Sequence, residues 1–242
     1  SSKRAMIKIQ NAQSRGLKIY AETCPQYLFL TANDLEEEGF EGAKYICSPP
    51  PRTLKDQENI WLGIKTGVFQ VFSSDHAPFR FDDAKGKKIE GSKTKFCNVP
   101  NGLPGIETRM PLLMSKGVLE NKIDIQKFVS LTSTSPAKIY GLYPRKGTIA
   151  PGSDADLVIW ETKNKFTLSN SMLHHNVDYT PYEGMELRAW PKIVFSRGEK
   201  IVDDGLLTAK KGHGNFLKSD YPLPAKTFDK SSLIERIENN TF

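Results

Sequence analysis

The sequence predicts an α/β protein whose chain continues into an all-β segment. Through about residue 145, helical and extended patterns alternate, which is the order of elements in folds whose helices cover a sheet. Beyond about residue 146 the sequence is rich in turn residues, and short extended runs replace the helical spacing. These two observations predict an α/β part, then a β part, then a polar tail.

Several segments of the α/β part place apolar residues at the spacing of a helix face. Their ranges are 3–15, 55–66, 104–116 and 124–130. Gly16 follows the first range directly and is expected to end that helix. A further helix is expected to open at Ser135 as the N-cap, with Pro136 in its first position.

Two apolar runs of the α/β part are expected to be strands, 17–22 and 68–73, and the second follows a predicted helix just as the first does. In the β part, 157–160 is expected to form a strand, and 192–202 a hairpin around Arg197 and Gly198. An α/β part of this length is shorter than a complete (β/α)8 barrel, which takes about 250 residues. A small open sheet and part of a barrel both fit.

The patterns place domain boundaries along the chain. The α/β part covers 1–145 and the β strands cover 146–207. Residues 208–242 are polar and rich in Pro, Lys and Asp, which is typical of an extended tail, and a last short helix is expected near 231–238.

Composition excludes several classes of protein. With 38% hydrophobic and 26% charged residues, the chain has the balance of a globular protein with a core. The net charge of +6 comes from dispersed basic residues, so we expect no nucleic-acid partner. No apolar run approaches the roughly 20 residues that span a bilayer, so we expect no membrane partner. The cysteines Cys24, Cys47 and Cys97 are odd in number and far apart, which predicts free thiols and a cytoplasmic location.

Asp75 is the first candidate functional residue. The predicted strand 68–73 runs into Ser74, Asp75 and His76, and active sites of α/β proteins gather at the carboxyl ends of strands. An aspartate there can bind a metal ion through one oxygen or act as a general base beside a metal-bound water. The alternative is an aspartate that caps the next loop beside a histidine that fills space.

Two loops provide further candidates. Ser48 precedes three prolines, which fix the backbone, so its main-chain and hydroxyl groups have one orientation that suits a planar amide ligand. Asn101 lies in a loop of Asn, Gly and Pro ahead of a predicted helix, a composition that brings backbone groups close to ligands. Both segments are also compatible with ordinary turns. His174 and His175 are interpreted as surface residues.

The histidine content limits a metal hypothesis. His76 is the only histidine of the α/β part, and a catalytic zinc takes about three protein ligands. Asp75 and His76 alone cannot hold such an ion. If the chemistry is metal-dependent hydrolysis, most of the ligands lie outside this chain.

Five segments together resemble the dihydropyrimidinase and hydantoinase branch of the amidohydrolase superfamily, in family order and with family-like spacing. They are AETCPQYL (21–28), CSPP (47–50), SSDHAPF (73–79), PNG (100–102) and GTIAPGSDADLV (147–158). The long tail and the segment 80–98 look closest to fungal dihydropyrimidinases. The resemblance implies the carboxy-terminal part of a metal-dependent (β/α)8 TIM barrel in 1–145, strands of a small β-sandwich domain in 146–207, and a tail at a subunit interface. It also implies that the protein is a homotetramer.

The resemblance also implies a site. Family members bind two zinc ions bridged by hydroxide and a carboxylated lysine, and that lysine lies outside this chain. Asp75 matches the aspartate that binds one zinc and carries the proton from the bridging hydroxide to the leaving nitrogen. Ser48 and Asn101 match positions whose main-chain groups hold the cyclic substrate. The chain is therefore expected to be inactive without an upstream half.

The implied reaction opens a 5,6-dihydropyrimidine, such as dihydrouracil or dihydrothymine, to an N-carbamoyl β-amino acid in pyrimidine catabolism. One alternative is a non-catalytic scaffold similar to the collapsin-response mediator proteins, which resemble this chain but generally lack the aspartate that matches Asp75. Another is a related hydantoinase, allantoinase or dihydroorotase.

Overall fold

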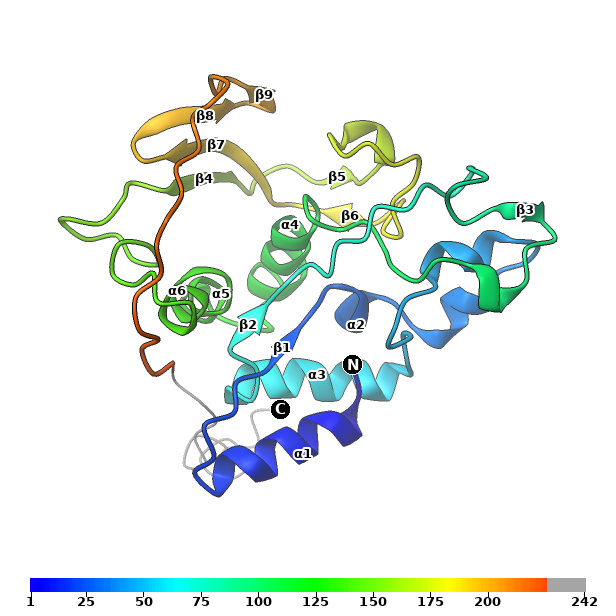
Figure 1. The fold of residues 1–242 in the computed structure, drawn as a ribbon, viewed down its shortest axis with the longest axis horizontal. Coiled ribbons are helices and arrows are strands. Elements are labelled where there is room, and N and C mark those ends of the chain that lie inside the picture. Colours follow the sequence, from blue (N-terminus) through cyan, green and yellow to red (C-terminus); the bar gives the residue numbers. More distant parts are fainter. Residues whose placement is uncertain (226–242) are drawn as a thin grey trace. The chain divides into compact units, whose positions relative to one another are not determined.

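A computed structural model describes residues 1–225 of the chain, and the helix expected near 231–238 lies outside them. The chain divides into two compact units. Among the described residues, the first unit contains Ser1–Met110 and Thr167–Glu186, and the second contains Pro111–Phe166 and residues 187–225. In the ribbon of Figure 1, helices and strands alternate through the blue and cyan part of the chain, as the sequence predicts.

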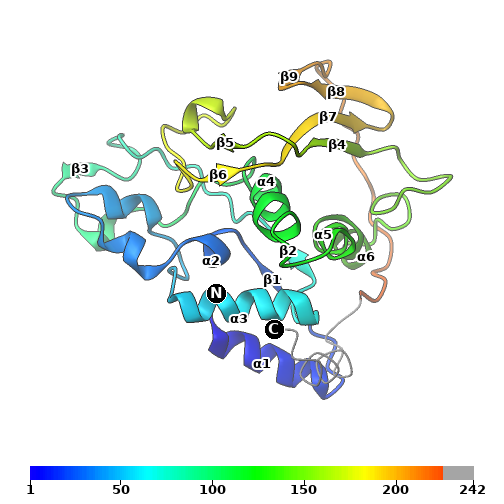
Figure 2. The same ribbon diagram turned by 180° about the vertical axis from the view of Figure 1, so that it is seen from behind.

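Two helices of the first unit lie side by side in both ribbon views (Figures 1 and 2). They are α1 (Lys3–Ser14) and α3 (Leu54–Thr66), and they confirm the two predicted helices. Ser2 caps α1 by accepting a hydrogen bond from the Ala5 amide at 3.2 Å. Thr53 and Asp56 form a capping box at the start of α3, and Gly67, with φ of 84°, ends it.

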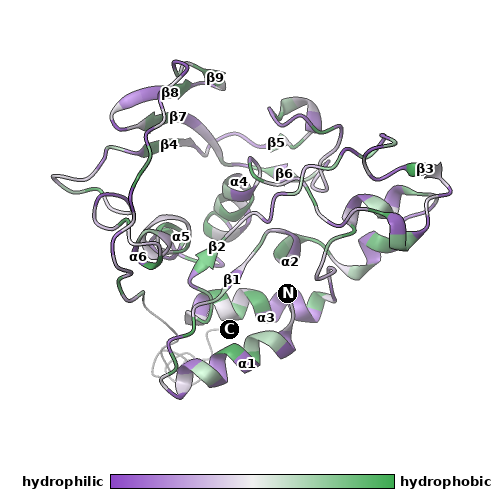
Figure 3. Ribbon diagram, in the orientation of Figure 1, coloured by the Kyte–Doolittle hydropathy of each residue, from purple (hydrophilic) through white to green (hydrophobic). Residues whose placement is uncertain are grey.

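The first unit also has two short parallel strands, β1 (Glu22–Thr23) and β2 (Val71–Phe72), paired with Glu22 opposite Val71. β2 is apolar in the hydropathy colouring of Figure 3. β2 is shorter than the predicted strand 68–73, and β1 begins only at Glu22, where the predicted strand 17–22 ends. The Gln70 side chain accepts a hydrogen bond from the Ala21 amide at 2.9 Å, so a side chain replaces a backbone partner where the ladder would start.

The remaining elements of the first unit are short. They are α2 (Gln26–Phe29), η1 (Ala32–Glu36), η2 (Glu41–Tyr45), β3 (Ile89–Ser92), η3 (Phe96–Asn98) and η6 (Asn170–Met172). Their loops share an apolar core of Ala43, Ile46, Phe81, Val99, Val177 and Tyr179. This core fixes loops that regular structure alone would leave loose.

The predicted helix 104–116 begins later than expected. It is divided into α4 (Arg109–Leu113) and a π-helical stretch, η4 (Met114–Val118). The amides of Gly105 and Ile106 donate to a histidine ring instead of joining a helix.

The second unit continues with a helical segment of α5 (Ile125–Val129), the π-helical η5 (Ser130–Thr134) and α6 (Ser135–Ile139). Asp124 caps α5 by accepting from the Lys127 amide. The prediction that Ser135 is an N-cap is wrong. The residue before it already has helical dihedral angles, and the Ser135 hydroxyl pairs with the Ser130 hydroxyl at 3.0 Å.

The β strands of the second unit form a four-stranded antiparallel sheet in the order β4-β7-β8-β9. Its strands are β4 (Leu157–Glu161), β7 (Trp190–Ser196), β8 (Glu199–Asp203) and β9 (Leu206–Leu207). The predicted hairpin is confirmed, with positive φ at Arg197 and Gly198. A separate pair joins β5 (Phe166–Thr167) to β6 (Glu186–Leu187). Among the described residues, no helix is long and apolar enough to cross a membrane.

Candidate functional site

The carboxyl ends of β1 and β2 meet at one edge, because the two strands are parallel. Cys24 follows β1 and Ser73 follows β2, and their Sγ and Oγ atoms lie 3.1 Å apart. The Arg109 guanidinium donates to the carbonyl of Phe72, the last residue of β2. Burial raises the pKa of the Cys24 thiol to about 11, so this cysteine stays protonated at neutral pH.

Asp75 lies just beyond this edge and is exposed. Its φ of 49° puts the backbone in the left-handed region, which aspartate tolerates better than most residues and which often marks functional positions. The Gln26 side-chain amide, only 1% exposed, donates to Asp75 Oδ2 at 3.0 Å. Within residues 1–225 this is the one side-chain hydrogen bond to the carboxylate, so Oδ2 is oriented and Oδ1 is available.

His76 supports a neighbouring loop. Its Nδ1 accepts hydrogen bonds from the amides of Gly105 at 3.0 Å and Ile106 at 3.3 Å. An accepting Nδ1 places the proton of the neutral ring on Nε2. Burial lowers the pKa of His76, which favours this neutral form. The ring therefore holds the loop before α4 rather than only filling space.

The Asn101 loop is attached to the segment after Asp75. Leu103 forms a parallel bridge with His76, and its carbonyl accepts from the Ala77 amide at 2.9 Å. Gly102 has φ of 135°, and a Cβ there would lie 2.2 Å from the Cβ of Ala77. Only glycine fits this contact, and Asn101 beside it is exposed.

The Ser48 loop is attached to the same edge. The Gly102 amide donates to the Ile46 carbonyl at 3.0 Å. The Tyr27 hydroxyl donates to the Pro49 carbonyl at 3.1 Å, so α2 contacts the Ser48 loop as well as Asp75. Ser48 is exposed, and the peptide bond that follows it is cis. Hydrogen bonds thus link the loops of all three predicted site residues.

Sequence reasoning missed two buried supports of this site. One is Gln26, which lies in one of the five resembling segments but is not itself a sequence-predicted site residue. The other is Lys87, which is 0% exposed and whose Nζ donates to the carbonyls of Ile46 at 3.2 Å and Pro100 at 3.1 Å. Burial lowers the pKa of Lys87 to about 8. Nothing local in the sequence separates Lys87 from its basic neighbours Lys85, which is exposed, and Lys88, which is half-buried.

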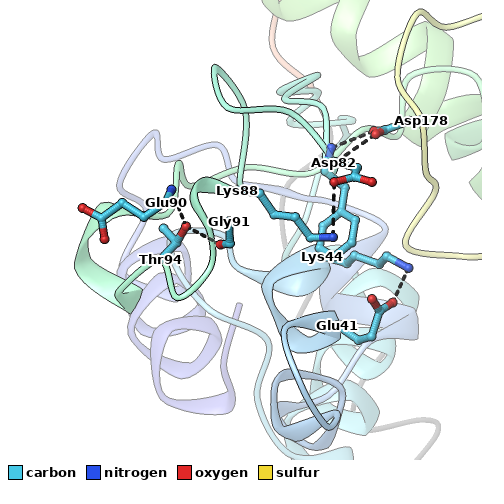
Figure 4. A network of polar contacts seen from close by, with 9 residues as sticks. Glu41, Lys44, Asp82, Lys88, Glu90, Gly91, Thr94 and Asp178 are labelled. Atoms are coloured by element: carbon cyan, nitrogen blue, oxygen red, sulfur yellow. Dashed lines mark hydrogen bonds and ion pairs between the residues drawn. The ribbon is translucent and has the colours of Figure 1, made fainter.

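The segment 80–98, which delivers Lys87, is anchored by charged and aromatic contacts (Figure 4). Asp178 accepts hydrogen bonds from the amides of Phe81 at 2.7 Å and Asp82 at 2.9 Å. The Phe81 ring lies 4.7 Å from the Lys44 ammonium and 4.5 Å from the Lys88 ammonium. Phe81 is buried, so this end of the segment is fixed.

The other histidines of the first unit do not join Asp75. His174 pairs with Glu107 through Nδ1 at 2.8 Å and is exposed, in agreement with a surface residue, and His175 Nε2 lies 2.8 Å from Asn170 Oδ1. In the part of the chain that the structure describes, no three His, Cys, Asp or Glu residues gather as a metal site would require. Asp75 therefore offers one ligand and not a set.

Residues 32–201 match the model of the Amidohydrolase family. The chain belongs to this family. It is 44% identical to a D-hydantoinase of Rhizobium radiobacter over 87% of its own length, and 44% identical to a D-hydantoinase of Geobacillus stearothermophilus over 90%. The crystal structure of dihydropyrimidinase from Brevibacillus agri NCHU1002 superposes with a TM-score of 0.87 at 42% identity, covering 93% of this chain and 48% of that one.

These relatives confirm the resemblance to the hydantoinase and dihydropyrimidinase branch. The chain spans about half the length of the curated relatives it matches, 45% in the case of both D-hydantoinases. This coverage agrees with the prediction that the chain corresponds to one half of such an enzyme.

Proposed function

We propose that the polypeptide carrying these residues hydrolyses cyclic amides, with 5,6-dihydropyrimidines such as dihydrouracil and dihydrothymine as substrates. One observation carries the proposal. Asp75 stands at the carboxyl end of β2, where Gln26 holds one carboxylate oxygen and no other side chain among residues 1–225 bonds the second. The relatives named D-hydantoinase and dihydropyrimidinase support the reaction class.

Asp75 fits the role of one ligand in a metal site. A carboxylate with an available oxygen is a suitable zinc ligand. The other ligands of two zinc ions, including a carboxylated lysine, would lie outside these residues. When bound, zinc would polarise the amide carbonyl and lower the pKa of the attacking water toward about 7.

The residues of this chain would position the ring and move a proton. Ser48 and Asn101 would offer main-chain N–H and C=O groups to the alternating C=O and N–H groups of a cyclic ureide. Ring opening adds the oxygen of water to the carbonyl carbon and breaks the C–N bond. Asp75 would accept the proton of the water and deliver it to the leaving nitrogen, which balances the reaction.

Asp75→Asn in the complete natural polypeptide tests this role. Asparagine keeps an oxygen that can accept from Gln26 but cannot carry the proton, so turnover of 5,6-dihydrouracil should fall by at least about 1000-fold with an unchanged melting temperature. Asp82→Asn, at an exposed aspartate in the following segment, is the matched control. An Asp75→Asn enzyme within tenfold of wild type would refute the role. Metal analysis should find about two zinc ions per chain, and a protein with none would refute the zinc dependence.

We further propose a cytoplasmic homotetramer in which β1 and β2 belong to a (β/α)8 barrel, the four-stranded sheet belongs to a β-sandwich, and the tail from residue 208 lies at a subunit interface. Phe216 and Tyr221 support the last point, because they are 94% and 93% exposed in one chain. Native mass spectrometry tests the tetramer, and a monomer would contradict it.

A further inference from the structure

We propose that Lys87 is a positioning residue that orients the Asn101 amide for the substrate by binding the carbonyl of the preceding residue. The inference rests on the proposed function, in which the Asn101 and Ser48 loops bind the substrate. Lys87 belongs to neither loop and reaches both from the segment 80–98.

The contact with Pro100 determines the direction of a donor. The carbonyl of Pro100 and the N–H of Asn101 belong to one planar peptide unit, and in a trans peptide they point in opposite directions. The Lys87 ammonium lies 3.1 Å from the Pro100 oxygen, so it fixes the plane and turns the Asn101 N–H away from itself. The positive charge of the Lys87 ammonium beside this oxygen also polarises the peptide group, which strengthens the Asn101 N–H as a donor.

The contact with Ile46 connects this donor to the second loop. The Ile46 carbonyl accepts from Lys87 Nζ at 3.2 Å and from the Gly102 amide at 3.0 Å. Ile46 lies two residues before Ser48, and Gly102 directly follows Asn101. One ammonium therefore holds both loops at a fixed separation.

The backbone delivers Lys87 to this position through a close turn. The Lys87 amide donates to the Arg80 carbonyl at 2.9 Å, and the Gly86 amide donates to the Asp83 carbonyl at 2.9 Å. A Cβ on Gly86 would lie 2.1 Å from the Arg80 oxygen, so this approach needs glycine. Arg80 precedes Phe81, whose amide is held by Asp178, so the turn starts from a fixed point.

Energetics argue against a purely structural role for Lys87. A buried ammonium loses its hydration, and within residues 1–225 the two hydrogen-bond partners of Lys87 Nζ are neutral carbonyls rather than a carboxylate. The Ile46 carbonyl already has a partner in Gly102. An unbranched apolar side chain would fill the same space without burying a charge, so the orientation of the carbonyls is what the ammonium adds.

The test is Lys87→Met in the complete polypeptide, with Lys88→Met as the matched control. Lys88 is the next residue and contacts Asp82 and Phe81, not the two loops. We expect Lys87→Met to raise the KM for 5,6-dihydrouracil by about 10-fold to 100-fold, the usual effect of losing a charged hydrogen bond, while kcat changes less and the melting temperature does not fall. Lys87→Gln, which keeps an N–H donor, should recover part of the KM.

Each outcome decides one question. A wild-type protein that does not open the ring contradicts the proposed function. An active wild type together with a folded Lys87→Met of unchanged KM overturns the role of Lys87 alone. A fall in melting temperature with unchanged KM, or failure of both Lys87 variants to fold, assigns the side chain to the core and also overturns the proposal.

Discussion

Replacing Gly102 by alanine would disturb the point where the loops of all three candidate residues meet. The added Cβ would lie 2.2 Å from the Cβ of Ala77, far inside contact distance, and the backbone has φ of 135°. The Gly102 amide donates to Ile46, and the next residue pairs with the segment after Asp75. Relief of the overlap therefore has to move one of these loops relative to another.

The cost has two separable parts. Holding a residue with a side chain in this backbone region costs about 1–3 kcal/mol. Overlap of two carbon atoms in a packed contact costs about 1–3 kcal/mol. Together they amount to about 4 kcal/mol, which appears as lost stability if the loops stay in place. If the Asn101 loop moves instead, the cost appears as a loss of kcat/KM of about 100-fold or more.

Two companion variants separate these parts. Gly91→Ala adds a side chain at φ of 63° in open space, so it should cost only about 1 kcal/mol of strain and leave activity unchanged. Combining Gly102→Ala with Ala77→Gly removes the overlap but not the strain, so it should recover about half of the loss. Urea denaturation and the kinetics of dihydrouracil opening are measured for each variant. A Gly102→Ala protein that matches wild type in both would refute the contact between the loops.

The remaining predictions concern single groups. Gln26→Met should lower kcat for dihydrouracil by about tenfold with little change in melting temperature, because it removes the donor that orients Asp75, and an unchanged kcat would contradict this. Burial alone would raise the pKa of Asp178, but the amides of Phe81 and Asp82 outweigh it and the pKa is lowered. The ionised Asp178 therefore stabilises the fold above the ordinary aspartate pKa, and this stabilisation is lost as pH falls through the lowered pKa of the folded protein. With Asp178→Asn, the free energy of unfolding should depend less on pH in the acid range. The pKa of Lys87 is lowered to about 8 in the folded protein and has its ordinary value of 10.5 in the unfolded chain, so the unfolded chain binds more protons between these two pH values. The free energy of unfolding should therefore rise with pH across that window by up to about 3 kcal/mol. Urea denaturation of Lys87→Met at several pH values should show no such rise.

The helices of the first unit were predictable because their end signals are local. Ser2 and Thr53 lie within three residues of the amides they cap, and Gly67 ends α3 through its own backbone angle. The strands were overestimated because an apolar run does not show where a side chain such as Gln70 takes the place of a ladder partner. The prediction of a new helix at Ser135 was wrong because Pro136 lies in the first turn of α6, which is typical of a helix start. The π-helical η5 precedes α6 directly, so the helical backbone is continuous through Ser135.

The residues of the candidate site also fall into those that local sequence predicts and those that depend on distant contacts. Asp75, Ser48 and Asn101 stand in short motifs next to predicted strand ends or prolines, so they were found from adjacent residues. Gln26 and Lys87 act across 49 residues to Asp75 and 41 residues to Ile46. No periodicity or spacing encodes such contacts, and a lysine in a basic stretch is ordinarily exposed.

The burial pattern explains why these supports matter more to the proposed chemistry than their sequence context suggests. The three groups that would meet the substrate are exposed, and loops with exposed tips hold a geometry only when something buried fixes their backbone. Here the fixing groups are Gln26 and Lys87, exposed by 1% and 0%. If main-chain groups of Ser48 and Asn101 bind the ring, truncating their side chains removes no contact with it, whereas truncating a buried support misdirects a donor. Substrate affinity should therefore respond to residues that the substrate does not touch.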